Sequence, residues 1–346
     1  MTLILLAVAA GTLAISYIVL PMLIRLSHRF GFLDRPHGRK RHASPTPFTG
    51  GWSIFIFFWL GLLICVRLMP ELKNELGHYL PSFFVAHALV FVGGVFDDFV
   101  SLRAPVKLLI QIAAASILFS AGLKIDTIYI PFSGSYLLGD LSYPATVLWV
   151  LLIVNALNIV DGLDGLAAGL SIIGAVGLLY AAIKLQIPVV AVLTVILIAV
   201  LLGFLRYNFP NARIFMGDSG AQSIGLVFAV AAIYCPIKSY TVAAMFVPLL
   251  TLGVPLIELA ISFLRRLSTG RSVVRGDFGH LFHLLPRRGV SKIKTVMMFW
   301  GVALALQIFV FTLFLFDRRI VFSILVVFMA VIAGWFLFLL KREEQN

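Results

Sequence analysis

Apolar runs of about 20 residues follow one another along most of the 346-residue chain. A helix needs about 20 such residues to cross the hydrocarbon core of a bilayer. Hydrophobic residues make up 61% of the sequence and charged residues 12%, whereas soluble domains average about 25% charged residues. The sequence therefore predicts an all-α polytopic membrane protein, formed as a single domain over residues 1–346.

The runs predict about eleven transmembrane helices. They are expected at about 2–24, 50–68, 80–96, 105–121, 144–160, 164–183, 188–205, 219–235, 240–264, 293–315 and 320–340. The ninth run carries Pro248 and Pro255, so we expect this helix to bend or split, because proline interrupts the helical hydrogen-bond ladder. Between the fourth and fifth runs, weak alternation and a Ser133-Gly134 turn predict a small periplasmic β-hairpin.

The positive charges predict the orientation of the chain. The first apolar run precedes its basic cluster, the reverse of the order in a signal peptide. Loops that follow odd-numbered runs, together with the C-terminus, hold 20 of the 27 lysines and arginines. By the positive-inside rule these loops are cytoplasmic. We expect a multi-pass protein of the bacterial inner membrane, with its N-terminus in the periplasm.

Five aspartates fall at the cytoplasmic ends of the expected helices. They are Asp97, Asp98, Asp161, Asp164 and Asp218. Ionisable groups at membrane depth are costly and mark functional sites, and like charges gathered at one depth repel one another unless a cation lies among them. A hard divalent cation with phosphate is the natural partner, Mg²⁺ or else Mn²⁺. The alternative is structural, since aspartate and asparagine are also common helix caps.

Basic residues and histidines lie in the same cytoplasmic loops. Lys40 and His42 belong to a basic cluster that suits phosphate or an anionic headgroup, although the orientation signal alone would also explain the cluster. Lys107 could pair with the aspartates or with a phosphate. His280 and His283 share a face if their segment is helical, and histidine can donate to phosphate or sugar. A zinc site at these histidines is less favoured, because no cysteine or glutamate accompanies them.

Five segments resemble the polyprenyl-phosphate N-acetylhexosamine-1-phosphate transferase superfamily, which contains the MraY and WecA enzymes. Nearly the whole chain is covered, and the likeness is closer to the WecA branch. The matching segments are Asp34-x-Pro36-x-x-Arg39-Lys40-x-His42-x-x-Pro45-x-Pro47-x-x-Gly50-Gly51, Asp97-Asp98 with Lys107, Asn155-x-x-Asn158-x-x-Asp161-Gly162-x-Asp164-Gly165, Phe215-Met216-Gly217-Asp218-Ser219-Gly220, and the loop with His280 and His283.

The resemblance implies transfer of N-acetylhexosamine-1-phosphate, with GlcNAc-1-phosphate favoured, from a UDP-sugar to undecaprenyl phosphate. UMP is released, and the reaction is the first membrane step of a surface glycan such as O-antigen. The implied catalytic residues are Asp97, Asp98, Asp161, His280 and His283, and the implied Mg²⁺ ligands are Asp218 and Asp98. The implied substrate-binding residues are Lys40, His42, Lys107, Asn158, Gly162, Leu163, Asp164, Asn208 and Phe215. The bent ninth helix would flank a lipid groove.

Three departures from the family pattern leave the sugar open. Phe278 and Phe282 stand where the WecA-like loop carries an arginine and a histidine, and Phe48 replaces an arginine of the first loop. The histidine spacing also differs from the three-in-a-row type that accompanies the muramyl-pentapeptide substrate. A UDP-N-acetyl-deoxyhexosamine is therefore an alternative substrate.

Three other classes of membrane protein are alternatives. A CDP-alcohol phosphotransferase needs an Ala-Arg soon after Asp-Gly and two further aspartates four residues apart downstream, and neither feature follows Asp161-Gly162. A secondary transporter with acidic ion sites would carry them near mid-bilayer, and a catalytically inactive binding homologue is a third alternative. Membrane lipid and a homodimer are expected partners, and nucleic acid is not.

Overall fold

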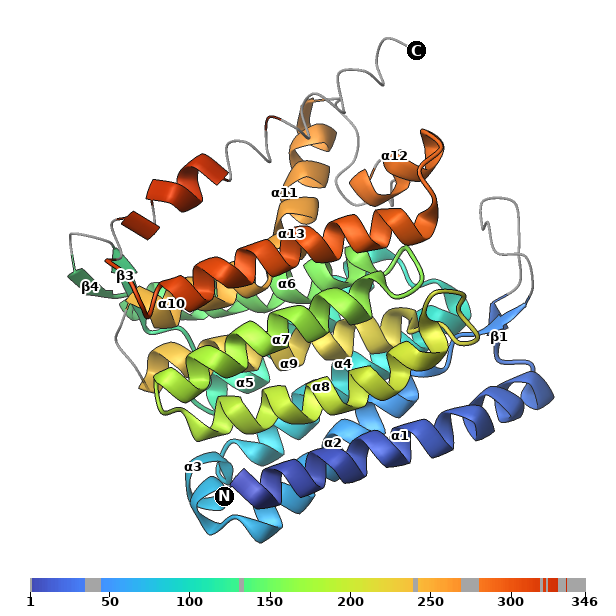
Figure 1. Ribbon diagram of the computed structural model, residues 1–346. Helices are drawn as coiled ribbons and strands as arrows, with labels where there is room; N and C mark the ends of the chain where they lie inside the picture. Colours follow the sequence, from blue (N-terminus) through green and yellow to red (C-terminus); the bar gives the residue numbers. More distant parts are fainter. Residues whose placement is uncertain are drawn as a thin grey trace.

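The computed structural model describes residues 2–34, 45–130, 134–238, 242–268, 280–317, 320–321, 323–328 and 334. Within these residues the chain forms a bundle of long helices (Figure 1). Eight of the described helices are long and apolar enough to cross a membrane, judged by length and composition. The prediction of a polytopic all-α membrane protein is confirmed.

The helix bounds lie close to the predicted ones. The helices are α1 (Thr2–Phe30), α2 (Gly50–Leu68), α3 (Pro70–Leu76), α4 (Leu80–Val100), α5 (Ala104–Ser120), α6 (Ser142–Val160), α7 (Leu166–Lys184), α8 (Pro188–Asn208), α9 (Gly217–Lys238), α10 (Val242–Thr251), α11 (Gly253–Ser268), α12 (Leu281–Arg287) and α13 (Lys292–Thr312), with a 3₁₀ turn at Gly139–Leu141. The expected ninth helix is split, with α10 and α11 meeting at Leu252 between its two prolines. The expected eleventh span, 320–340, lies mostly outside the described residues.

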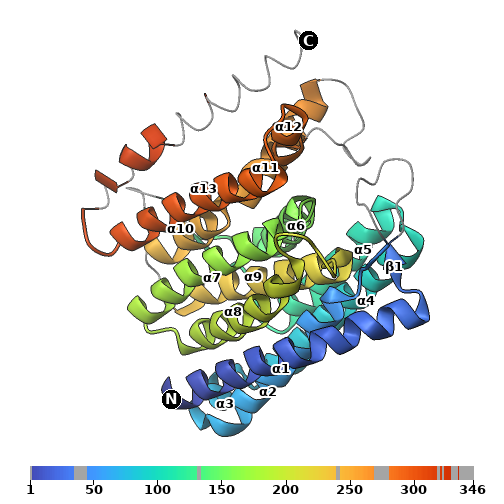
Figure 2. The same ribbon diagram turned by 45° about the vertical axis from the view of Figure 1, so that its right-hand side comes forward.

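Two short antiparallel pairs complete the described secondary structure. The predicted hairpin is confirmed: β3 (Thr127–Ile130) pairs with β4 (Gly134–Leu137). β1 (Leu33–Asp34) pairs with β2 (Thr46–Pro47), which ties together the two ends of the first polar loop. Figure 1 shows α3 and the hairpin at one end of the bundle, and β1 and α12 at the opposite end. Figure 2 shows α3 and β1 at the same opposite ends in a second view.

Helix α9 is the central element of the bundle. It is the least hydrophobic of the eight candidate spans, yet 94% of its window from Gly217 to Cys235 is buried. It packs against α2, α4, α6 and α8. A polar segment at membrane depth is tolerated when it faces the bundle interior, and small residues let helix backbones approach closely there. The polar residues of α9 therefore dictate its central position.

Glycines on the neighbouring helices make this packing possible. A β-carbon at Gly94 of α4 would overlap the backbone of Ser219, and one at Gly51 of α2 would overlap the backbone of Gly220. The first turn of α9 is thus held in backbone contact by two helices. This close approach also brings the C-terminal end of α4 against the start of α9.

We predict that Gly94→Ala destabilises the protein by about 1 to 3 kcal/mol, the usual cost of overpacking a close contact. Gly11→Ala in α1 is the matched control, because nothing lies within 4 Å of the added carbon there and alanine is the better helix former. Melting temperatures in detergent test this. Equal melting temperatures for the two variants would show that the α4–α9 contact is not tight.

Candidate active site

Acidic residues of two helices meet at one lysine. Lys107, in the first turn of α5, forms an ion pair with the carboxylate of Asp97 on α4. Its Nζ also lies 3.1 Å from Oδ2 of Asp218 on α9. The side chain of Asp97 is 2% exposed, and its Oδ1 accepts a hydrogen bond of 2.7 Å from the backbone N–H of Leu102. One cation thus bridges two carboxylates that are 121 residues apart in sequence.

Asp98 caps the N-terminus of α9 from a different helix. Its Oδ1 accepts from the backbone N–H of Asp218 at 2.7 Å, and its Oδ2 accepts from that of Ser219 at 3.2 Å. Gly217 permits this arrangement, because its φ of +71° suits glycine and a β-carbon would lie 2.7 Å from Asp98 Oδ2. The capping alternative thus holds for this aspartate, although neither Asp218 nor Ser219 provides the cap. Helix N-termini favour negative charge.

Asp161 ends α6 and faces the same acidic cluster. Burial and the neighbouring carboxylates of Asp218, Asp98 and Asp164 raise the pKa of Asp161 well above its usual range. The described part of the chain gives this carboxylate no ion-pair partner. One turn earlier, Oδ1 of Asn158 is buried and has no hydrogen-bond partner among the described residues. Buried acceptors are normally paired, so both groups are open to a cation or to a donor from a ligand.

The donor set suits a hard divalent cation. Five aspartates interact here, with Lys107 as the neighbouring cation among the described residues, which leaves an excess of negative charge and oxygen ligands. No group of three or more His, Cys, Asp or Glu side chains in the described ranges is arranged as a ready-made metal cage. Mg²⁺ often takes only one or two carboxylates and completes its shell with phosphate and water. Asp218 and Asp161 would be its ligands, since Asp98 directs both oxygens to α9.

A layer of amides lies one helical turn deeper in the bundle. Gln111 donates through Nε2 to Oε1 of Gln222 at 3.2 Å, and Asn155 donates through Nδ2 to Oε1 of Gln111 at 2.7 Å. Gln111 and Gln222 follow Lys107 and Asp218 by four residues, so each pair shares a helix face. This layer fixes the rotation of α5, α6 and α9 relative to one another. Gln111 and Gln222 were missed by the sequence analysis, although that spacing was a signal.

Asp164 and Asn208 build the loops around the site. Asp164 Oδ2 accepts from the backbone N–H of Ala212 at 3.0 Å. Asn208 accepts from Gly165 N–H at 2.8 Å and donates to the carbonyl of Ile214 at 2.9 Å. Together they tie the turn after α6 to the loop before α9. Both residues were expected to contact substrate, and in the structure these side-chain hydrogen bonds go to backbone groups.

The histidine segment packs on the turn after α6. A β-carbon at Gly162 would overlap the ring of Phe282 and lie 3.4 Å from His283. His280 precedes α12 as its N-cap residue, and its ring lies near that of His283, with centroids 6.3 Å apart. The Phe282 ring contacts both histidines, with centroids 5.3 Å from His280 and 4.5 Å from His283. Phe282 is 1% exposed, so it is packed inside the protein, away from an open rim.

Relatives of the chain carry names of one enzyme class. A family model described as glycosyl transferase family 4 matches residues 80–236. A probable undecaprenyl-phosphate N-acetylglucosaminyl 1-phosphate transferase of Bacillus subtilis (strain 168) is 34% identical over 320 residues, which cover 91% of this chain and 87% of that protein. The chain belongs to the polyprenyl-phosphate N-acetylhexosamine-1-phosphate transferase superfamily.

Members of this superfamily that resemble the chain bear different substrate names. An undecaprenyl-phosphate alpha-N-acetylglucosaminyl 1-phosphate transferase of Thermotoga maritima is 30% identical over 284 residues, 82% of each chain. A phospho-N-acetylmuramoyl-pentapeptide-transferase of Desulforudis audaxviator is 34% identical over 333 residues, 87% of this chain and 96% of that protein. The overall sequence identity to these relatives therefore does not indicate which sugar this chain transfers.

Some of the remaining predicted site residues lie in the part of the chain that the structure describes, and others lie outside it. Leu163 packs against the hydrophobic core. Phe215 hydrogen-bonds through its backbone to Pro47 and Gly50, which joins the loop before α9 to the first polar loop. Phe48, one of the departures from the superfamily pattern, packs edge-to-face on Phe99 with ring centroids 5.1 Å apart. Lys40, His42 and Phe278 lie outside the described residues.

We predict that Asp98→Ala lowers the melting temperature in detergent, because α9 loses its cap; cap removal costs about 0.5 to 2 kcal/mol. Asp98→Asn keeps one acceptor oxygen and should fall between the alanine variant and the wild type. Should Asp98→Ala melt with the wild type, its carboxylate does not stabilise α9, and a direct role at a metal becomes the better account.

Proposed function

We propose that the protein transfers N-acetylhexosamine-1-phosphate from a UDP-sugar to undecaprenyl phosphate and releases UMP. GlcNAc-1-phosphate is the group that we favour. The reaction would start the assembly of a surface glycan in the bacterial inner membrane. The names of its relatives support the chemistry, and the excess of positive charge on one set of loops supports an active site on the cytoplasmic face, with the N-terminus in the periplasm.

The transfer joins two phosphates without water. An oxygen of the lipid phosphate attacks the phosphorus that carries the sugar, and a new P–O bond forms. The bond from that phosphorus to the bridging oxygen of the uridine-bearing phosphate breaks, and UMP leaves with the bonding electrons. Both reactants are anions, so positioning and charge compensation supply most of the catalysis.

The observation that carries the proposal is the Lys107 bridge between Asp97 and Asp218, beside Asp161 and Asn158. Among the described residues, Asp161 has no ion-pair partner and Oδ1 of Asn158 has no hydrogen-bond partner. Mg²⁺ held by Asp218 and Asp161 would offset the charge of the diphosphate. Asp97 lies against Lys107 and would orient the lipid phosphate or remove its proton. Lys107 can exchange one carboxylate for a phosphate oxygen, and His280 and His283 would face the sugar diphosphate.

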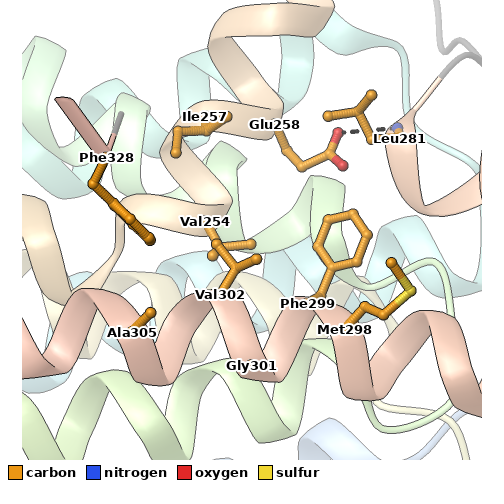
Figure 3. Close-up of a pocket in the computed structure, with 10 residues that line it drawn as sticks. All are labelled: Val254, Ile257, Glu258, Leu281, Met298, Phe299, Gly301, Val302, Ala305 and Phe328. Carbon is orange, nitrogen blue, oxygen red and sulfur yellow. Dashed lines mark hydrogen bonds between the residues drawn. The ribbon is translucent and has the colours of Figure 1, made fainter. Parts of the chain in front are cut away.

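An apolar cavity extends from this end of the bundle between α11, α12 and α13. Its volume is ≈ 330 Å³, and Figure 3 shows its walls. Val254 and Ile257 line it from α11, and Phe299 and Val302 line it from α13. Leu281 begins α12 beside the histidines, so the cavity lies next to them. We propose that it accommodates the first isoprene units of the lipid substrate.

The sugar is the least constrained part of the proposal. Phe282 is buried against Gly162, so it shapes the histidine segment and offers no donor to a sugar hydroxyl. A site that lacks a polar partner discriminates less strongly against a sugar without the matching hydroxyl. GlcNAc thus stays the favoured sugar and a deoxy-N-acetylhexosamine the alternative. A homodimer stays a prediction.

Release of UMP from a panel of UDP-sugars tests the proposal. Purified protein with undecaprenyl phosphate and Mg²⁺ should release UMP with UDP-GlcNAc or a UDP-N-acetyl-deoxyhexosamine. Asp218→Asn should keep less than about a tenth of the activity, because a lost metal ligand costs several kcal/mol of transition-state stabilisation. Asp140→Asn is the control, since Asp140 is exposed in the 3₁₀ turn before α6. No UMP release with any sugar, or full activity of Asp218→Asn, would contradict the proposal.

A further inference from the structure

Glu258 is a buried acid that lies outside the carboxylate cluster. It belongs to α11 and is 1% exposed. Among the described residues that line the cavity it is the one with a charged side chain, and the others are apolar or glycine. Figure 3 shows its carboxylate directed toward the start of α12. A buried ionised carboxylate is costly unless it is paired or hydrogen-bonded, so a partner for Glu258 is required.

The start of α12 supplies that partner. The backbone N–H of Leu281 donates to Glu258 Oε2 at 3.4 Å (Figure 3). Nδ1 of His280 lies 3.7 Å from the same oxygen, within ion-pair distance. Glu258 Oε1 and His280 Nδ1 are both buried and lack a hydrogen-bond partner among the described residues. His280 Nδ1 would form a hydrogen bond with Glu258 Oε2 after a shift of about 0.5 Å, because N–H···O hydrogen bonds reach about 3.2 Å.

The ring of His280 is also held from its other side. It stacks on Phe282 with an interplanar angle of 2°, and Phe282 packs against Gly162 next to Asp161. Glu258 and Phe282 therefore fix the position of the imidazole near the turn after α6. The hydrogen bond made by one ring nitrogen decides the protonation of the other. With Nδ1 directed to Glu258, Nε2 is the nitrogen left for a substrate oxygen.

We propose that Glu258 is a positioning residue for the transfer reaction, holding His280 through Nδ1 so that Nε2 meets the sugar diphosphate. An imidazolium donates from both nitrogens, so a protonated ring whose Nδ1 faces Glu258 can donate from Nε2 to a phosphate oxygen. This inference rests on the proposed function. In this inference Glu258 affects turnover only by positioning His280, and it does not contact the diphosphate itself.

A double-mutant cycle on turnover tests this dependence. Glu258→Gln keeps the shape of the side chain and an acceptor for Leu281 N–H, so the fold should persist. We expect it to lower kcat about tenfold, as loss of a partner that orients an active-site histidine does, with a much smaller change in the KM of the UDP-sugar. In the His280→Gln background the same change should have little further effect, because coupled residues are not additive. Met297→Leu, on the exposed side of α13 and outside the cavity, should match the wild type.

Each outcome separates the inference from the proposed function. Independent, multiplying losses from the two substitutions, or wild-type turnover of Glu258→Gln, would overturn the role of Glu258 and leave the transferase proposal intact. A wild-type protein that releases no UMP would overturn both. If Glu258→Gln fails to fold, Glu258→Asp replaces it in the cycle. The aspartate keeps the negative charge but its shorter side chain moves the carboxylate away from His280. The fall in kcat that it causes should therefore also disappear in the His280→Gln background.

Discussion

The structure depends on the burial of a polar helix end at membrane depth. Helix α9 begins with Gly217, Asp218, Ser219 and Gly220, and these residues could not face lipid without a large desolvation cost. They are surrounded by α2 and α4, whose glycines allow backbone contact, and by the capping carboxylate of Asp98. Once α9 is placed, the ends of α4, α5 and α6 must converge around it. The site follows from this packing constraint.

Charge compensation is the second consequence of this arrangement. Lys107 forms ion pairs with both Asp97 and Asp218. Asp161 faces other carboxylates, and these carboxylates together with burial raise its pKa. The cluster therefore holds more carboxylates than Lys107, its cation among the described residues, can pair with. Anionic phosphates would bind there together with a divalent ion more readily than alone. The amide layer of Gln111, Gln222 and Asn155 keeps the helices in the register that this balance requires.

Much of the fold could be predicted from the sequence, because membrane spans are encoded locally by length and hydrophobicity. The hairpin and the split at Leu252 followed from alternation and from proline chemistry. The convergence of Asp97, Asp161 and Asp218 followed from counting spans, since alternate helix ends must share one side. These features depend on the order of segments along the chain and on little else.

The contacts within the site could not be predicted in the same way. The sequence does not reveal that Asp98 caps a helix 119 residues away, because that bond depends on how closely α4 and α9 pack. Glu258 looked like one charge in an apolar run and gave no hint of its place beside His280. Phe282 stands where the superfamily loop carries a histidine, but its packing against Gly162 depends on a tertiary contact that the sequence does not show.

The central claim is that Lys107 holds α4 and α9 together through Asp97 and Asp218. The substitution Lys107→Met tests this claim most directly. Removing one partner of a buried ion pair leaves an uncompensated charge and costs about 3 to 5 kcal/mol of stability. Because the side chain of Lys107 is 25% exposed and solvent screens its charge, we expect a smaller loss of stability than this. The melting temperature in detergent should fall clearly for Lys107→Met and recover in Lys107→Met/Asp97→Asn, which also removes the uncompensated charge of Asp97. A double variant that melts no higher than Lys107→Met, or a single variant as stable as the wild type, would contradict the account.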